Sequence, residues 1–171
     1  MTLSDVDREI LDFTIELASK SLELGSQATP FGAAVTVGGK LMGFSRSWVV
    51  ASHDPTAHAE VLAIQRTCKM LGSHQIPGAV LYSSSHPCPL CFMAARWAGI
   101  ERIVYAGSLL TSAVGGFEDE QYYRELENLK DSQPIEMETP SEGYDNVIAD
   151  LMAEWKAQWG HKNTLIPEKE S

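Results

Sequence analysis

The chain has 171 residues with 13 basic and 23 acidic side chains, so its formal net charge is −10. A surface of that sign repels phosphate, which argues against nucleic acid as the main partner. The length suits one domain with a proper core, and a hydrophobic content of 44% is ordinary for a globular protein.

Cysteine content and targeting signals bear on the location of the protein. Three cysteines are too few for a disulfide framework, so a reducing compartment is expected. The first residues contain no basic region followed by an apolar run, and the uncharged stretch 103–117 is too short to cross a bilayer. We therefore expect a cytoplasmic protein without membrane contact.

Residues 4–72 show the signals of a helix, a hairpin and a second helix. Ser4 with an acidic residue three positions later predicts a capped helix, whose apolar periodicity stops at Gly25. Gly32–Val37 is predicted to be a strand that returns over residues 40–45 through a two-glycine turn. The next helix is predicted to end at Gly72 and to bury an apolar stripe made of Ala57, Val61, Ile64, Cys68 and Leu71.

Strands and helices alternate in the rest of the chain. Residues 79–83 and 102–106 are predicted to be buried strands on either side of a helix that ends at Gly99. This alternation indicates an α/β protein whose sheet is partly parallel and covered on both faces. The C-terminal part is predicted to contain an acidic helix, an edge strand and an amphipathic helix, at 118–130, 134–138 and 144–159. We expect one domain over 1–161 and a flexible tail over 162–171.

Two short motifs contain the side chains that point to a chemistry. Residues 54–60 read Asp-Pro-Thr-Ala-His-Ala-Glu, and residues 86–91 read His-Pro-Cys-Pro-Leu-Cys. His58, Cys88 and Cys91 are three zinc ligands, whereas a structural zinc site fills all four positions with protein groups. Three ligands leave one position for water, and Glu60 adds a carboxylate base. The set predicts one catalytic Zn²⁺ per chain.

Local signals indicate how the two motifs meet. Asp54 followed by Pro55 predicts a helix N-terminus, which would place His58 in the first turn. Cys88 and Cys91 are framed by prolines and are predicted to open a second helix. Two helix N-termini directed at one point favour thiolates there.

Other interpretations of these residues explain less. A thioredoxin-type redox pair would account for Cys-x-x-Cys but would leave Glu60 unexplained. Cys68 lies ten residues beyond His58 on one helix, about 15 Å away at about 1.5 Å per residue, so it is expected to be a small core residue. His86 is expected at the rim of the pocket rather than as a ligand. Structural roles are expected for His53, His74 and His161.

The joint pattern of His58-Ala59-Glu60 and Pro87-Cys88-Pro89-Leu90-Cys91 resembles the cytidine-deaminase-like zinc hydrolases, and the likeness extends from residue 30 to about 123. Within that superfamily, residues 54–61 and 116–119 are most similar to guanine deaminases. The resemblance implies a three-layer α/β/α sandwich around a five-stranded mixed sheet, and a homodimer. It also implies that Asp119 contacts the edge of a purine.

Two positions depart from the pattern of guanine deaminases. These enzymes and many relatives have Glu where this chain has His86. They also carry Gly-x-Asn after the second hairpin strand, and that Asn contacts the substrate, whereas this chain has Gly43-Phe44-Ser45. Neither departure involves the metal ligands or Glu60, but both concern the pocket.

The sequence therefore predicts hydrolytic deamination of a free nucleobase or a related heterocycle, guanine first, with Glu60 moving the protons. Cytosine or isocytosine is an alternative substrate of the same chemistry. Deamination of adenosine in tRNA is a second alternative, and the ten acidic and two basic residues between 116 and 145 argue against it. A non-catalytic zinc module for protein binding is a third, and it leaves Glu60 without a role.

Overall fold

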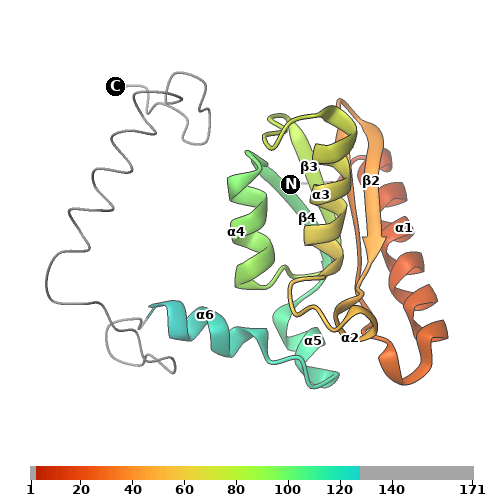
Figure 1. Ribbon diagram of the computed structural model, residues 1–171, viewed down its shortest axis with the longest axis vertical. Helices are drawn as coiled ribbons and strands as arrows, with labels where there is room; N and C mark the ends of the chain where they lie inside the picture. Colours follow the sequence, from red (N-terminus) through yellow and green to blue (C-terminus); the bar gives the residue numbers. More distant parts are fainter. Residues whose placement is uncertain (1–2, 128–171) are drawn as a thin grey trace, which may run out of the picture. The chain divides into compact units, whose positions relative to one another are not determined.

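A four-stranded mixed sheet lies at the centre of the part of the chain that the computed structural model describes, residues 3–127 (Figure 1). The strands are β1 (Gly32–Val37), β2 (Lys40–Arg46), β3 (Ala79–Ser85) and β4 (Arg102–Gly107), in the order β2-β1-β3-β4. β1 is antiparallel to β2 and β3, whereas β3 and β4 are parallel. The predicted edge strand at 134–138, the helix at 144–159 and the tail at 162–171 lie outside the described residues, so the fifth strand stays a prediction.

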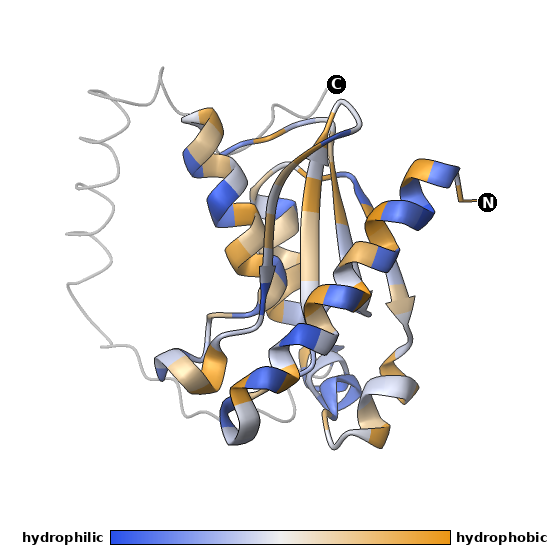
Figure 2. Cartoon of the chain, turned by 90° about the vertical axis from the view of Figure 1, so that its right-hand side faces the viewer, coloured by the Kyte–Doolittle hydropathy of each residue, from blue (hydrophilic) through white to orange (hydrophobic). Residues whose placement is uncertain are grey.

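Helices cover both faces of this sheet, as expected for a three-layer α/β/α sandwich (Figure 1). One face carries α1 (Asp5–Ser21), which continues into the 3₁₀ helix η1 (Leu22–Gln27), and the other carries α3 (Ala59–Leu71) and α4 (Pro89–Trp97). Figure 2 shows hydrophobic and hydrophilic residues alternating around α1, the pattern of a helix with one buried side. Three shorter helices complete the described part: α2 (Val49–Ser52), α5 (Leu109–Val114) and α6 (Asp119–Glu127). No helix within residues 3–127 has the length and apolar character needed to span a bilayer.

The hairpin between β1 and β2 has the turn that its two glycines predict. Gly38 and Gly39 both have positive φ, +58° and +78°, which is the conformation of a type I′ turn and matches the twist of the two strands. The core lies between this hairpin, β3 and the paired helices α3 and α4. Its fully buried members include Val35, Leu81 and Ala95.

A buried carboxylate fixes α1 to the sheet. Asp7 accepts two hydrogen bonds of 2.8 Å from the guanidinium of Arg102 on β4 and one of 2.7 Å from the hydroxyl of Tyr82 on β3. It also closes the predicted capping box with Ser4. The bonds from Arg102, followed by those from Tyr82 and Ser4, hold the pKa of Asp7 well below its usual range. The first turn of α1 is thereby joined to two strands.

The buried side of α3 differs from the predicted apolar stripe. Ile64 is buried as expected, but Leu71 is 43% exposed, and the residues that face the sheet include Ala63 and Thr67. Small side chains occur here because β2 approaches closely at Gly43, where a Cβ atom would lie 2.5 Å from the carbonyl oxygen of Ala63 and closer still to the Thr67 hydroxyl. The prediction considered only the hydrophobicity of the residues on α3, whereas the close approach of the α3 and β2 backbones requires small side chains between them.

Gly43→Ala should therefore lower the free energy of unfolding by about 1–3 kcal/mol, because the added methyl group forces β2 away from α3. Urea denaturation measures the change. Gly107→Ala is the matched control, since a Cβ atom there would meet its nearest neighbours at 3.3 Å and should cost less. Equal stability of wild type and Gly43→Ala would show that α3 and β2 are not packed as described.

Candidate active site

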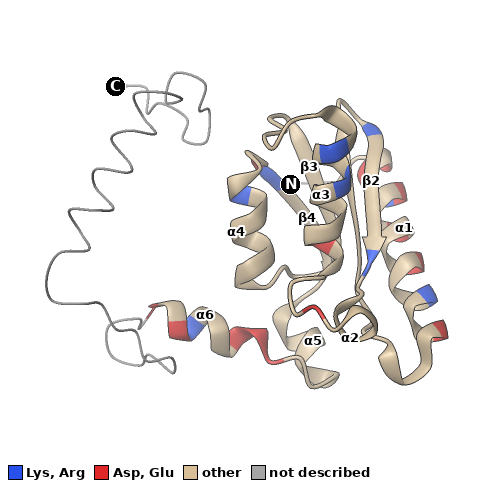
Figure 3. Cartoon of the chain, viewed as in Figure 1, with Lys and Arg blue, Asp and Glu red and all other residues tan. Residues whose placement is uncertain are grey.

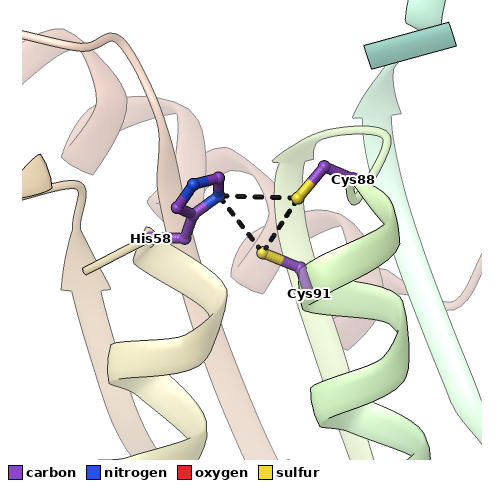
Figure 4. A group of neighbouring side chains, drawn as sticks. All are labelled: His58, Cys88 and Cys91. Atoms are coloured by element: carbon purple, nitrogen blue, oxygen red, sulfur yellow. Dashed lines mark hydrogen bonds between the residues drawn. The ribbon is translucent and has the colours of Figure 1, made fainter. Parts of the chain in front are cut away.

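The two motifs meet at the carboxyl end of β3, where the N-termini of α3 and α4 lie next to each other (Figure 4). His58 is the residue that precedes α3, and Cys88 is the residue that precedes α4. Pro89 occupies the first turn of α4. Backbone N–H groups in the first turn have no acceptor within the helix, so the N–H that proline lacks costs no hydrogen bond there. Cys91 follows in the same turn and is completely buried. The predicted opening of a helix by the cysteine motif is confirmed.

The start of α3 corrects the prediction for the histidine motif. Asp54 does not cap the helix. Its carboxylate accepts hydrogen bonds of 2.8 and 2.7 Å from the backbone N–H and the hydroxyl of Thr56, which closes a local turn. The helix begins only at Ala59, and His58 keeps an extended backbone with ψ of 150°. Because His58 precedes the helix, its side chain and that of Glu60 both reach Cys91.

Three ligand atoms of these motifs form a triangle. His58 Nδ1 lies 3.6 Å from Cys88 Sγ and 3.4 Å from Cys91 Sγ, and the two sulfur atoms lie 3.6 Å apart (Figure 4). With Zn–S of about 2.3 Å and Zn–N of about 2.0–2.1 Å, a tetrahedral site separates two sulfur atoms by about 3.8 Å and sulfur from nitrogen by about 3.6 Å. The observed spacing fits such a site. Within residues 3–127, His58, Cys88 and Cys91 are the group that could hold a metal ion.

The electrostatics of the triangle also suit a cation. The hydrogen bond between the Cys88 and Cys91 side chains lowers the pKa of Cys88 to about 4. The pKa of Cys91 is raised because it shares that hydrogen bond and is buried. The Cys88 thiolate in turn raises the pKa of His58. A metal ion that binds here displaces the protons of this cluster, because thiolate and neutral imidazole are the ligand forms.

Glu60 lies beside the triangle without being part of it. One carboxylate oxygen, Oε2, is 3.4 Å from Cys91 Sγ, and the other, Oε1, accepts a 2.8 Å hydrogen bond from Ser83 on β3. Burial raises the pKa of Glu60. Sequence reasoning did not identify Ser83. The run of three serines at the end of β3, directly before the cysteine motif, was the available signal.

A cleft of about 300 Å³ opens onto these groups. His58, Glu60, Cys88 and Asp119 all line it, so the structure brings four of the five predicted site residues to one cavity, with Cys91 directly behind. Burial, and next the Cys88 thiolate, raise the pKa of Asp119. The remaining lining residues are Thr29, Phe31, Ser47, Val49, Ala59, His86, Gly116, Phe117, Glu118 and Tyr122.

Two contacts place α6, and with it Asp119, over this cleft. Gly116 has a φ of +84°, a turn that brings Phe117 edge-on to Phe31 with ring centres 4.7 Å apart. One turn after Asp119, the hydroxyl of Tyr123 donates a 2.7 Å hydrogen bond to the Pro87 carbonyl. The acidic helix is thus joined both to the strand layer and to the cysteine loop.

The two residues considered as further ligands stand apart from the triangle. His86 donates from Nδ1 to the Pro87 carbonyl at 2.9 Å and packs edge-on against Tyr105 and Tyr123. It lines the cleft, in agreement with the expected position at the rim. Cys68 lies on α3 next to the carbonyl of His74, far along the helix from the site.

A family model for the cytidine and deoxycytidylate deaminase zinc-binding region matches residues 4–107, more than half of the chain. The chain belongs to this family. The match includes the metal-ligand triangle and Glu60, and it ends before α6 and Asp119.

Individual proteins and solved structures are similar to this chain over much of its length. The guanine deaminase of Bacillus subtilis (strain 168) is 39% identical over 106 residues, which cover 62% of this chain and 68% of that enzyme. Its crystal structure superposes with a TM-score of 0.75 at 28% identity and covers 99% of both chains. A second structure, a complex with 2,6-diaminopurine, has a TM-score of 0.61 and 27% identity over 70% of this chain and 65% of that one. The tRNA-specific adenosine deaminase of Agrobacterium fabrum (strain C58) is 37% identical over 76 residues, 44% of this chain and 50% of that protein.

Proposed function

We propose that the protein is a zinc-dependent hydrolase that removes the amino group of a free nucleobase, guanine first, as ammonia. The observation that carries the proposal is the position of the Glu60 carboxylate, 3.4 Å from a sulfur of the ligand triangle and in a cleft that also contains Asp119. The relationship to a guanine deaminase over two thirds of that enzyme supports the choice of base.

The ligand triangle would hold Zn²⁺ through His58 Nδ1 and the two cysteine sulfurs. Zinc in such a site lowers the pKa of water to near neutrality. Ser83 fixes one oxygen of Glu60, which leaves Oε2 directed towards the triangle. We assign to this carboxylate the transfer of a proton from water to the ring nitrogen beside the amino-bearing carbon. The oxygen of that water bonds to the amino-bearing carbon. Glu60 then moves the proton of the new hydroxyl group to the amino group, the C–N bond breaks as the C=O bond forms, and ammonia leaves.

Asp119 provides the acceptor for a purine edge. A carboxylate can accept hydrogen bonds from a ring N–H and an exocyclic amine at once, which are the donors that guanine presents. Its position on α6, fixed by the contacts of Phe117 and Tyr123, keeps it at the cleft. Discrimination follows because a base without those donors leaves a half-buried carboxylate unpaired.

Deamination of adenosine in tRNA is the second candidate, because tRNA-specific adenosine deaminases are among the relatives. The charge at the cleft argues against it. Acidic residues dominate α6 (Figure 3), with Asp119, Glu120, Glu125 and Glu127 against Arg124. A phosphate backbone entering beside this helix would meet repulsion.

Ammonia release over a panel of substrates tests the proposal. The panel contains guanine, cytosine, isocytosine, adenine, their nucleosides, and an anticodon stem-loop of tRNA. We expect guanine to be the best substrate and the stem-loop to release no ammonia. If only the stem-loop is deaminated, the second candidate replaces the proposal. If only cytosine is deaminated, the assignment as a nucleobase deaminase stands, but guanine is not the substrate.

Asp119→Asn should reduce kcat/KM for guanine about tenfold to a thousandfold, because the amide presents a donor where the base also presents donors. Zinc content and melting temperature should stay at the wild-type values, since Asp119 is outside the triangle. Steady-state kinetics with parallel metal analysis measure both. Unchanged guanine kinetics would mean that Asp119 merely begins α6.

A further inference from the structure

Two buried serines, Ser45 and Ser47, lie at or just after the end of β2, and they differ in what their side chains face. Ser45 does not face the cleft. Its side chain is 2% exposed, its hydroxyl donates to the Arg46 carbonyl at 2.8 Å, and it is absent from the lining of the cleft. The hydroxyl of Ser45 is therefore not available to a molecule in the cleft.

Two residues further along, Ser47 does line the cleft. It is 3% exposed, and its backbone N–H donates to the Phe31 carbonyl at 2.9 Å, which fixes its position beside β1. Its side-chain oxygen accepts a 2.6 Å hydrogen bond from the hydroxyl of Thr29, a second lining residue. Because the oxygen of Ser47 is the acceptor in this pair, its own proton is directed elsewhere. Among the residues that the structure describes, no group accepts it.

The other polar side chains that line the cleft do not offer a comparable buried hydrogen-bond donor. Glu60, Glu118 and Asp119 present carboxylates, which accept hydrogen bonds when ionised. His86 uses its Nδ1 proton on the Pro87 carbonyl, so that proton is not available to a molecule in the cleft. The hydroxyl of Tyr122 belongs to a residue that is 56% exposed. Among the described residues that line the cleft, Ser47 is thus the buried, uncharged side chain whose proton is available for a hydrogen bond.

We propose that Ser47, oriented by Thr29, is a specificity-determining residue that donates its hydroxyl proton to an acceptor on the bound base, the carbonyl oxygen or the ring nitrogen N7. Together with Asp119 it makes the cleft complementary to a heterocycle that presents donors at one edge and an acceptor at another. This inference rests on the proposed function and specifies how its site selects the substrate.

The test compares Ser47→Ala with wild type on guanine, 7-deazaguanine and 2-aminopurine, of which the last two each lack one acceptor of guanine. We expect Ser47→Ala to lower kcat/KM for guanine about tenfold to a hundredfold. For the analogue without the acceptor that Ser47 contacts, the two proteins should be equal, because the hydrogen bond is already missing. Thr29→Val, which preserves the shape, should give a smaller loss with the same dependence on substrate.

Ser45→Ala is the matched control, since it removes a buried hydroxyl of the same strand end that does not face the cleft, and its kinetics should equal those of wild type. Zinc content and melting temperature are measured for every variant. Guanine kinetics of Ser47→Ala within twofold of wild type overturn the inference and leave the proposed function intact. An equal loss on all three bases also overturns it, because that pattern indicates a structural role. A wild type that deaminates no heterocycle overturns the proposed function, and this inference with it.

Discussion

Replacing Glu60 with glutamine should abolish most turnover while leaving the metal site and the fold in place. The expected loss in kcat is at least about 10²–10⁴-fold, the range for a residue that moves protons in the transition state. Glutamine has nearly the same shape and can still accept the hydrogen bond that Ser83 donates to Oε1, so the position of the side chain should be preserved. Steady-state ammonia release by the zinc-loaded variant measures the effect.

Glu9→Gln is a suitable control for this substitution, because Glu9 is an exposed residue of α1, the helix on the other face of the sheet from α3 and α4. It should behave as wild type. The turnover rates of Glu60→Gln and wild type are compared at equal zinc content. Turnover by Glu60→Gln at a near wild-type rate would show that another group moves the protons.

The second large effect is expected from Cys91→Ser. Wild type should bind one Zn²⁺ per chain, and the variant should lose far more affinity than the roughly 10–100-fold that follows removal of a group outside the ligand set. Cys91 is fully buried and its sulfur is close to both His58 Nδ1 and Cys88 Sγ, so the substitution replaces one of three converging ligand atoms by a hydroxyl, which is not among the usual protein ligands of zinc. Elemental analysis after dialysis against a weak chelator measures the metal.

Cys68→Ser provides the matched control for the loss of zinc, because it changes the remaining cysteine, which lies on α3 outside the triangle. It should retain one zinc per chain. His86→Ala should retain it as well, since His86 uses its Nδ1 proton on the Pro87 carbonyl. Loss of zinc in His86→Ala would make it a ligand, and full zinc occupancy in Cys91→Ser would contradict the assigned set.

Much of the scaffold followed from local signals in the sequence. Ser4 and Asp7 form the predicted capping box, and the glycine pair at 38–39 forms the predicted turn between β1 and β2. The strand Gly32–Val37 has the predicted bounds. In each case residues close in sequence determine the conformation, through a capping hydrogen bond or a positive φ. Homodimerisation and cytoplasmic location stay predictions.

The errors arose where a competing contact decides the outcome. Asp54 looked like a helix cap, but the side chain that satisfies its carboxylate belongs to Thr56, and α3 starts five residues later. The apolar stripe failed at Leu71 because the approach of Gly43 from β2 requires small residues on the other side of α3. Neither competing hydrogen bonds nor backbone separation can be derived from hydrophobic periodicity.

The metal triangle was predictable because its residues carry a distinctive spacing, and the structure brings them together at distances that suit zinc. The residues that support it were not. Ser83 lies on β3, and Ser47 directly follows β2. Even the run of three serines at the end of β3 does not indicate which of them contacts Glu60. The roles of Ser83 and Ser47 depend on the strand order of the sheet, which places them beside Glu60 and Thr29.

Conversion of guanine is the most direct measurement of the central claim. Zinc-loaded wild type is incubated with guanine, and the loss of guanine, the formation of xanthine and the release of ammonia are followed together. We predict one xanthine and one ammonia for each guanine consumed, no reaction after removal of the metal, and recovery when Zn²⁺ is added back. Unchanged guanine after incubation with fully zinc-loaded wild type would contradict the assignment of guanine as substrate.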